Sequence, residues 1–582
     1  MEMVNVKINN MPISVPQGST ILDAAKLAGI DIPTLCYMRE MNEIGACRIC
    51  VVEVKGARSL VASCVFPVNE GMEIFTNTPR VQKSRKITLE LILSTHDRKC
   101  LSCFRSGNGN CELQTLCHEF GVDDEGHYDG ERQVYPVEKT PYIVRDNNKC
   151  ILCRRCEAAC REQHVGVIGP NARGFDTHIG CAFEKNLADV PCVACGQCLV
   201  NCPTGALVEK DEVDDVFAAI ADPDKVVIVH PAPSIRVTLG ESFGMPVGSN
   251  VKGKMVAALR RLGFDKVFDT DFGADLTIME EANEFIGRVK NGGVLPMITS
   301  CSPGWIQYAE SYYPDLIPHL SSCKSPQQMT GAVIKTYYAQ KEGLDPKNIV
   351  TVSIIPCTAK KVEADRADQS AAGEGIPDVD FALTTRELAR MISRSGIGFT
   401  KLPDEDFDNT LDVSTGAASI FGATGGVMEA ALRTAADVLT GKDLSELDYT
   451  EVRGTKSIKE AVYNIAGMDV KVAVASGLKN ASKLLDKIKT GKADYHFIEI
   501  MCCPGGCVNG GGQPMQPSSV RNFVDLKAVR AQALYEEDRG MPFRKSHDSP
   551  AIKMVYKDFF GEPGSHKAHE ILHTTYVPRE KY

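Results

Sequence analysis

The sequence predicts an α/β multidomain protein in which small cysteine-rich units precede one larger α/β domain. Its 582 residues leave room for several domains, and a hydrophobic content of 43% is ordinary for a globular chain. Seventeen of its 23 cysteines lie in residues 1–202, spaced by two or three residues within clusters. After residue 210, buried apolar strands alternate with helical stretches. That alternation is typical of an α/β domain with sites at the carboxyl ends of its strands.

The charge and hydropathy of the chain argue against two classes of partner. A formal net charge of −10 and a pI near 5.7 lack the basic footprint of a nucleic-acid binder. The N-terminus has no basic region followed by an apolar run, and no stretch reaches the roughly 18–20 apolar residues of a membrane span. We therefore expect a cytoplasmic protein whose partners are small molecules or proteins, with no nucleic acid and no membrane.

The first unit, residues 1–80, is predicted to be a small α+β domain. Two strands, VNVKI and ISVPQG, flank an NNMP turn, and a short amphipathic helix follows, capped by Ser19 or Thr20 and ended by Gly29. Four cysteines follow the helix: Cys36, Cys47, Cys50 and Cys64. Their spacing resembles the plant-type ferredoxin pattern with a longer first gap, so we expect a [2Fe–2S] cluster. Zinc would accept the same four thiolates.

The second unit, residues 81–140, combines a helical segment, RVQKSRKITLELILSTH, with a second group of metal ligands. The candidate ligands are His96, Cys100, Cys103 and Cys111. The histidine follows the helix directly and precedes a CxxC pair by four residues, so we interpret it as a ligand of a [4Fe–4S] cluster. A neutral imidazole in place of a thiolate raises the cluster potential. Cys117 and His118, just beyond, are not expected to be ligands.

The third unit, residues 141–210, contains the ferredoxin run twice, as CILCRRCEAAC and as CVACGQCLVNCP. In two-cluster ferredoxins the fourth cysteine of each run ligates the other cluster. The predicted [4Fe–4S] ligand sets are therefore Cys150, Cys153, Cys156 and Cys202 for one cluster, and Cys160, Cys192, Cys195 and Cys198 for the other. Cys181 is left over. A reducing cytosol disfavours disulfides, and structural zinc is the other alternative.

Four clusters in series form an electron wire, which needs a terminus. Both the large iron–sulfur subunits of respiratory NADH dehydrogenases, with some formate dehydrogenases, and the [FeFe]-hydrogenases begin in this way. Six cysteines remain after residue 210: Cys301, Cys323, Cys357, Cys502, Cys503 and Cys507. The segments TSCSPGW, IIPCTAKKVEADR, FGATGGVMEAALRTA and MCCPGGC resemble the signature segments of the [FeFe]-hydrogenase catalytic domain. Residues 211–582 are then expected to be the H-cluster catalytic domain, with a C-terminal small-subunit-like segment.

This resemblance implies a cofactor and its ligands. The H-cluster is a [4Fe–4S] cube joined through a cysteine to a diiron unit with carbon monoxide, cyanide and an azadithiolate. By position, the cube ligands are Cys357, Cys503 and Cys507, with Cys507 as the bridge. Lys360 and Ser234 match the donors to the two cyanides, and Met501 matches the methionine against the diiron unit. Pro233, Gln327 and Phe421 are assigned to the same pocket.

The resemblance also implies a proton route to the buried metal. Its members here are Cys301, Glu281, Ser321, Glu284 and Arg288. The helical pattern of MEEANEFIGR places Glu281, Glu284 and Arg288 at i, i+3 and i+7, on one face. From the residues alone, the alternative is a solvated face with an ion pair between Glu284 and Arg288.

Three positions depart from the family pattern. Ser302 stands where most members have a cysteine that ligates the cube, Cys502 replaces an alanine, and Ile355 replaces a methionine near the bridging carbonyl. A serine hydroxyl loses its proton at a far higher pH than a thiol, which makes it a poor iron ligand. Three alternatives stay open: Ser302 binds as an alkoxide, Cys502 or Cys301 supplies the fourth thiolate, or the cube has a labile corner.

We expect reversible hydrogen activation, 2H⁺ + 2e⁻ ⇌ H₂, with electrons carried by the accessory clusters. A hydrogen or redox sensor with slow turnover is the alternative, although sensor forms tend to lose the relay cysteine, kept here as Cys301. An electron-transfer subunit of a dehydrogenase complex would lack the distal segments. The sequence shows no Rossmann glycine fingerprint. The expected partners are therefore ferredoxin or NAD(P)H- and flavin-binding subunits, together with maturation proteins for the diiron unit.

Overall fold

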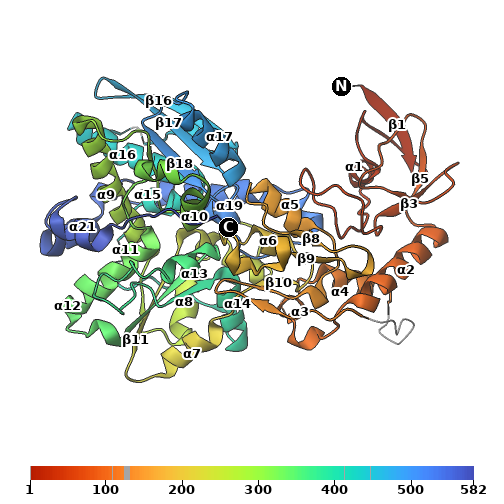
Figure 1. Cartoon of the computed structure of the whole chain (residues 1–582), viewed down its shortest axis with the longest axis horizontal. Coiled ribbons are helices and arrows are strands. Elements are labelled where there is room, and N and C mark those ends of the chain that lie inside the picture. The colour runs from red at the N-terminus through yellow and green to blue at the C-terminus, as the bar shows by residue number, and fades with distance from the viewer. Residues whose placement is uncertain are drawn as a thin grey trace.

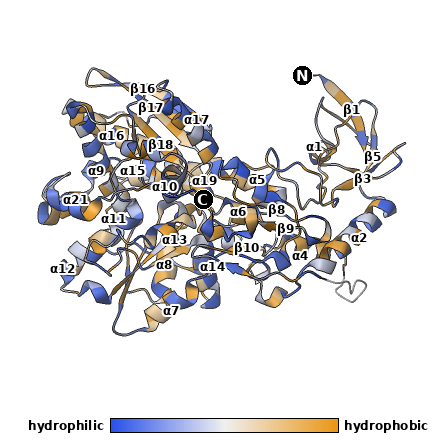
Figure 2. Ribbon diagram, in the orientation of Figure 1, coloured by the Kyte–Doolittle hydropathy of each residue, from blue (hydrophilic) through white to orange (hydrophobic). Residues whose placement is uncertain are grey.

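The computed structural model describes residues 2–107, 109–122, 132–409, 411, 413–445 and 447–581. Figure 1 shows an elongated molecule with the cysteine-rich units at one end and the larger α/β part at the other. The predicted second unit therefore includes residues, 123–131, that lie outside the described chain. Figure 2 shows apolar strands inside the α/β part and polar residues on many of its outer helices.

The first unit is a five-stranded sheet with one short helix. The sheet order is β2-β1-β5-β3-β4. Its elements are β1 (Met3–Ile8), β2 (Met11–Pro16), α1 (Ile21–Leu27), β3 (Val51–Val54), β4 (Val61–Ala62) and β5 (Glu73–Phe75). The two predicted strands and the helix are confirmed. Thr20 caps α1 through a capping box with Asp23, which satisfies backbone donors that the first turn leaves free.

The next two units are mostly short helices and hairpins. The predicted helix of the second unit is α2 (Pro79–Thr95), which starts earlier than its apolar pattern because Thr78 caps it and proline suits its first turn. Helices α3 (Phe104–Gly107), α4 (Glu112–Glu119), α5 (Arg155–Glu162) and α6 (Gln197–Asn201) follow. The strands are β6 (Glu138–Lys139), β7 (Ile143–Arg145) and β10 (Leu207–Glu209) in one sheet, and β8 (Gly169–Asn171) with β9 (His178–Gly180) in another.

A parallel four-stranded sheet organises one half of the large domain. Its order is β12-β11-β14-β15, and it consists of β11 (Val226–Pro231), β12 (Lys266–Val267), β14 (Ile349–Ile355) and β15 (Phe381–Thr384). Every residue of β14 is buried because helices cover both faces. One face packs on α7 (Val213–Ala221), α8 (Lys252–Leu262) and α14 (Thr385–Arg394), and the other on α9 (Thr270–Asn291), α11 (Pro326–Val333) and α20 (Pro550–Val555).

A second four-stranded sheet organises the other half. Its order is β13-β18-β17-β16, with β13 (Met297–Ile298), β16 (Ile458–Ile465), β17 (Met468–Ser476) and β18 (Phe497–Met501). One face packs on α10 (Pro303–Tyr312) and α17 (Leu478–Lys489), the other on α9, α15 (Gly416–Ser419) and α16 (Gly426–Thr440). Helix α9 thus packs on both sheets. It joins the two cores into one body (Figure 1).

Loops that follow four of these strands carry the predicted active-site residues. Ser234 follows β11, Cys357 follows β14, Cys301 follows β13, and Cys503 follows β18. Since the carboxyl ends of parallel strands lie at the same sheet edge, each sheet offers two such loops to the space between them. The predicted site residues therefore lie where the sequence pattern placed them, after the carboxyl ends of strands. Among the described residues, no helix has the length and apolar character needed to cross a bilayer.

Candidate active site and electron-transfer clusters

A cavity of about 90 Å³ lies where these loops meet. Its lining includes every residue that the sequence assigned to the H-cluster pocket: Pro233, Ser234, Gln327, Cys357, Lys360, Phe421, Met501, Cys503 and Cys507. Cys301, Ser302, Ile355 and Cys502 line it as well. The lining is largely apolar apart from thiols and a few polar side chains, which suits a site that excludes water.

The three predicted cube cysteines are close together in a dry environment. Burial, and then the neighbouring thiols of Cys503 and Cys507, raises the pKa of Cys357 well above its ordinary value. Burial, followed by Cys503, raises the pKa of Cys507 to about 12. Such thiols need a strong positive charge to ionise, and bound iron would provide it. The donor set therefore fits an iron–sulfur cluster.

The spacing of the thiols argues against single zinc ions. A tetrahedral zinc site holds its ligand atoms about 3.3–3.8 Å apart. Across the described chain, no group of three or more cysteines brings its sulfur atoms within 4.8 Å of one another. A [4Fe–4S] cluster spreads its four thiolates because each binds a different iron, whereas a [2Fe–2S] cluster has two thiolates on each iron. For the predicted [4Fe–4S] groups, this wider spacing favours clusters over structural zinc.

Glycines on either side of Cys507 allow two close backbone approaches. Gly506 has φ +95°, and a Cβ there would lie 2.6 Å from the amide nitrogen of Thr424. At Gly511, a Cβ would lie 2.3 Å from the carbonyl oxygen of Cys195. Side chains at either position would push the loop away from its neighbours. The glycines therefore hold the cysteine loop against both the cavity wall and the third N-terminal unit.

Polar partners orient the two predicted cyanide donors. The Lys360 ammonium binds Glu363 Oε2 at 2.9 Å, Ser325 Oγ at 2.6 Å and the carbonyl oxygen of Cys301 at 3.3 Å. Ser234 is fully buried, and its hydroxyl accepts a bond from Gln513 Nε2 at 3.2 Å. No role was predicted for Glu363 or Gln513 from the sequence. For Glu363, the signal was its position three residues after Lys360 on α13 (Ala359–Ala364).

Cys502 lies between two predicted cluster ligands. Its raised pKa is due first to the Cys195 thiol, then to the Cys503 thiol, and then to burial. Its sulfur packs on Gly304, where an added Cβ would approach it to 2.7 Å. Cys195 also lines the cavity. The third N-terminal unit therefore reaches the wall of the active site, with Cys502 at the junction.

The predicted proton route begins at Cys301 and continues on α9. Glu281 is 1% exposed, and neither of its carboxyl oxygens has a hydrogen-bond partner within the described structure. Burial, and then the charge of Glu284, raises the pKa of Glu281 to about 8. A buried carboxyl with a pKa near neutrality can both take up and release a proton.

The outer half of the route is a connected set of hydrogen bonds. Ser321 donates to Glu284 Oε2 at 3.0 Å, and Arg288 binds Glu284 Oε1 at 2.6 Å. Glu284 and Arg288 are partly exposed. The ion pair that the sequence offered as the alternative is therefore present, and it lies at the solvent end of the predicted route.

The first cysteine group comes together as the sequence predicted. The Cys50 and Cys64 sulfurs are 3.3 Å apart, and the Cys47 amide lies 3.5 Å from Cys36 Sγ. The charges of Cys36 and Cys47 contribute to the raised pKa of Cys64, which places both thiols near it. The four thiols thus share one buried site.

The His96 group shows a ring suited to metal binding. His96 is buried at the end of α2, and its Nδ1 has no hydrogen-bond partner among the described residues. Burial lowers the pKa of His96 to about 4, so the ring is neutral at pH 7. A neutral imidazole with an unpartnered nitrogen fits a metal ligand. Cys103 and Cys111 lie close enough for the charge of one to raise the pKa of the other.

The third unit brings together both predicted ligand sets. Burial raises the pKa of Cys156 well above its ordinary value, and Cys153, Cys150 and Cys202 add to the effect in that order. Cys198 responds in the same way to burial and then to Cys195, Cys192 and Cys160. The fourth cysteine of each run thus lies near the first three of the other, as the predicted crossed pairing requires. Cys181 lies apart and accepts a bond from Arg145 at 3.7 Å.

Comparison with known proteins decides the family. Residues 225–511 match the model of the iron only hydrogenase large subunit, C-terminal domain, and residues 524–579 that of the iron hydrogenase small subunit. The NADP-reducing hydrogenase subunit HndD of Solidesulfovibrio fructosivorans is 49% identical over 593 residues, covering 100% of both chains. The chain belongs to the iron-only hydrogenases. This [FeFe]-hydrogenase is also 44% identical to iron hydrogenase 1 of Clostridium pasteurianum over 580 residues, 99% of this chain and 100% of that one.

A solved structure and two further matches agree with this assignment. Apo [FeFe]-hydrogenase HydA1 from Chlamydomonas reinhardtii matches 64% of this chain and 100% of its own, with 42% identity and a TM-score of 0.57. Residues 1–79 match a 2Fe-2S iron-sulfur cluster binding domain, and residues 85–125 match the NADH-ubiquinone oxidoreductase-G iron-sulfur binding region. The predicted family, fold class and enzyme class are confirmed. The hydrogenase activates hydrogen reversibly at an H-cluster, with electron relay through iron–sulfur domains.

Proposed function

We propose that this hydrogenase exchanges electrons with NAD(P)H- and flavin-binding partner subunits, or with ferredoxin, through one [2Fe–2S] and three [4Fe–4S] accessory clusters. The chain would divide into four parts: residues 1–80, 81–140, 141–210 and 211–582. The similarity to an NADP-reducing hydrogenase subunit supports the nicotinamide link. This link also favours a cytoplasmic location. Maturation proteins would be needed to build the diiron unit.

The observation that carries the electron route is the position of Cys195. This predicted ligand of an accessory cluster lines the catalytic cavity beside Cys502. Gln197 donates to the Asn509 carbonyl at 2.9 Å, and Thr358 to the Ala194 carbonyl at 2.6 Å, so both active-site loops are fixed to the cluster-bearing unit. The cluster held by Cys160, Cys192, Cys195 and Cys198 would therefore be the last one before the H-cluster.

The residues of the cavity would hold and shield the H-cluster, which supplies the metal where the H–H bond is made or broken. Cys357, Cys503 and Cys507 would bind the cube. Lys360 and Ser234 would donate hydrogen bonds to anionic ligands, where charge-assisted bonds are strong. The remaining contacts, from Pro233, Gln327, Phe421 and Met501, would exclude water and so strengthen those bonds.

For the fourth cube ligand we favour Cys502. The Ser302 hydroxyl already accepts the Cys502 amide, and its proton is far harder to remove than that of a thiol. Cys502 lines the same cavity and lies beside Cys503. This choice leaves Cys301 free for the proton route through Glu281, Ser321, Glu284 and Arg288. Cys502 would then bind the cube, and Cys301 would transfer protons.

Two measurements on the anaerobically purified, matured chain test this proposal. Iron analysis should give about 20 iron atoms for the four accessory clusters and the H-cluster together. Hydrogen formation should proceed with a reduced viologen or ferredoxin, and not with NAD(P)H until a flavin-binding partner is added. Iron near the content of the H-cluster alone, with stoichiometric zinc, would refute the accessory clusters. Direct use of NAD(P)H by the lone chain would refute the need for a partner.

A further inference from the structure

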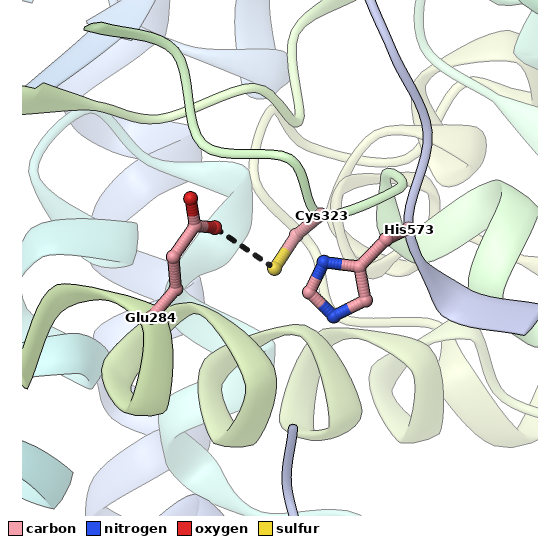
Figure 3. A group of neighbouring side chains, drawn as sticks. All are labelled: Glu284, Cys323 and His573. Atoms are coloured by element: carbon pink, nitrogen blue, oxygen red, sulfur yellow. Dashed lines mark hydrogen bonds between the residues drawn. The ribbon is translucent and has the colours of Figure 1, made fainter. Parts of the chain in front are cut away.

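Three side chains from distant parts of the sequence converge beside the proton route. Figure 3 shows Glu284 on α9, with Cys323 and His573 reaching it from two other segments. Their ligand atoms, a carboxylate oxygen, Sγ and a ring nitrogen, all lie within 4.8 Å of one another. Within the described chain, no other group of three or more such ligands is this compact. A β-bridge between Cys323 and His573 holds their backbones together.

The neighbours of His573 determine which of its ring nitrogens carries the proton. Its Nε2 lies 3.1 Å from Glu280 Oε2, and the Glu280 side chain is fully buried. The amide of Gly564 donates to the same oxygen at 2.9 Å, and the Tyr556 hydroxyl donates to the other. Glu280 is an acceptor, so we assign the ring proton to Nε2. Metal-binding histidines typically donate their second nitrogen to a carboxylate in this way, so the lone pair of Nδ1, which now faces the Ser322 hydroxyl at 2.8 Å, is the one that would bind a metal.

One carboxylate oxygen of Glu284, Oε2, faces this site, where it accepts hydrogen bonds from the Ser321 hydroxyl and the Ser322 amide, both at 3.0 Å. Glu284 Oε1 is bound by Arg288, while Oε2 also faces Cys323 Sγ at 3.9 Å and the Ser322 hydroxyl at 3.2 Å. The Ser322 hydroxyl also lies 2.8 Å from His573 Nδ1. It therefore occupies the space between the carboxylate and the imidazole. A cation bound there would keep the Arg288 ion pair intact.

We propose that Glu284, Cys323 and His573 form a binding site for a divalent cation of the zinc type. One thiolate, one imidazole and one carboxylate form a donor set that suits Zn²⁺. Ideal zinc geometry needs ligand separations of about 3.3–3.8 Å, so the three side chains would move inward by roughly 1 Å or less. The Ser322 hydroxyl or a water molecule would complete the tetrahedron.

Zinc binding must displace a proton from Cys323. The thiol is fully buried, and burial followed by the charges of Glu284 and Glu281 raises its pKa well above the ordinary value. At neutral pH the sulfur therefore carries its proton. One Zn²⁺ enters, a Zn–S bond forms, and one proton leaves to solvent, with no change in oxidation state. The apparent zinc affinity should therefore increase with pH.

The functional consequence rests on the proposed proton route. Zinc on Glu284 Oε2 would occupy the oxygen that accepts from Ser321 and would neutralise the carboxylate. Protons could then no longer pass between Ser321 and solvent through this residue. Zinc would inhibit turnover at a distance from the H-cluster, without changing the ligands of any iron.

X-ray absorption at the zinc edge of the matured holoenzyme, loaded with one equivalent of Zn²⁺, tests the site directly. It should show one sulfur at about 2.3 Å with nitrogen and oxygen at about 2.0–2.1 Å. Cys323→Ala should lose the sulfur, and His573→Gln should weaken zinc binding at least tenfold. Cys181→Ala, which removes another buried thiol, should leave the spectrum unchanged. A sulfur shell that persists in Cys323→Ala, or the absence of any sulfur in the parent, would overturn the site.

Zinc inhibition, measured against each protein's own uninhibited rate, tests the consequence. Half-inhibition should need at least tenfold more zinc in Cys323→Ala, while the infrared bands of the diiron unit stay unchanged on zinc addition. Equal zinc sensitivity in the parent and Cys323→Ala would contradict the inhibitory role of this site. Zinc bound through Cys323 without inhibition would support the site and refute the route through Glu284 instead.

Discussion

The backbone amide of Cys502 donates a hydrogen bond to the hydroxyl of Ser302 at 3.2 Å. Two of the three positions that depart from the family pattern, Ser302 and Cys502, thus contact each other in the wall of the cavity. A thiol lost from one loop and gained in the other can therefore serve the same cluster.

This contact yields a prediction for the cube ligand. Cys502→Ala should remove one thiolate and damage the cube, whereas Ser302→Ala should leave it intact. The paired change Ser302→Cys with Cys502→Ala should restore the cube, because the thiolate returns to the facing loop. Mössbauer and electron paramagnetic resonance spectra of the matured proteins would report the cube. An intact cube in Cys502→Ala, with damage in Ser302→Ala, would make Ser302 the ligand.

A second prediction concerns His96. His96→Cys should lower the reduction potential of one [4Fe–4S] cluster by on the order of 100 mV, because an anionic thiolate replaces a neutral imidazole. Redox titration followed by electron paramagnetic resonance measures the shift. Replacing His118, which follows the same group but is not a predicted ligand, by cysteine serves as the control and should shift nothing. If no cluster moves to lower potential in His96→Cys, His96 is not a ligand.

The pKa of Glu281 predicts a pH dependence of turnover. Burial raises this pKa to about 8, so the carboxyl is protonated below that pH and charged above it. Hydrogen formation needs a protonated donor behind Cys301, so its rate should fall as the pH rises through about 8. Glu281→Gln should lower turnover by about 10²–10⁴-fold, since an amide cannot release a proton. An unchanged pH profile and rate in Glu281→Gln would exclude Glu281 from the route.

Gly506 beside the cysteine loop and Gly441 at the end of α16 both have positive φ, but we expect their substitution to have different effects. Gly506→Ala should reduce cluster insertion strongly, because its Cβ would lie 2.6 Å from the Thr424 amide at φ +95°. Gly441→Ala, at φ +66° with open space around it, should cost only the backbone strain, about 1–2 kcal/mol. Iron content and thermal unfolding of both variants measure the difference. Equal iron content would mean that the close approach at Gly506 is not required.

Local patterns predicted much of the fold. The buried runs that became β11 and β14, and the capping signal at Thr20, depend on neighbouring residues and could be seen in the sequence. The ligands of the accessory clusters could also be predicted from the sequence, because each ligand set contains a CxxC spacing. The two separate sheets of the large domain, by contrast, result from pairings between strands far apart in the chain.

The active-site cavity could be assigned only through family resemblance. The cysteines that the large domain contributes lie on three separate loops, so no local spacing connects Cys301, Cys357 and Cys503. The contact between Cys323 and His573 joins two segments that carry no shared motif, and although Cys323 was counted among the distal cysteines, no role was predicted for either residue. Likewise, the position of Cys195 on the cavity wall depends on how the third unit packs on the large domain.

We expect Cys301 to link the H-cluster to the proton route. Infrared spectra and hydrogen turnover of the matured Cys301→Ala variant, measured on one preparation, test it most directly. The carbon monoxide and cyanide bands should stay essentially intact while turnover falls by about 10²–10⁴-fold, because proton supply is lost and assembly is not. Near-normal turnover in this variant, or loss of the bands together with the cube, would contradict the account.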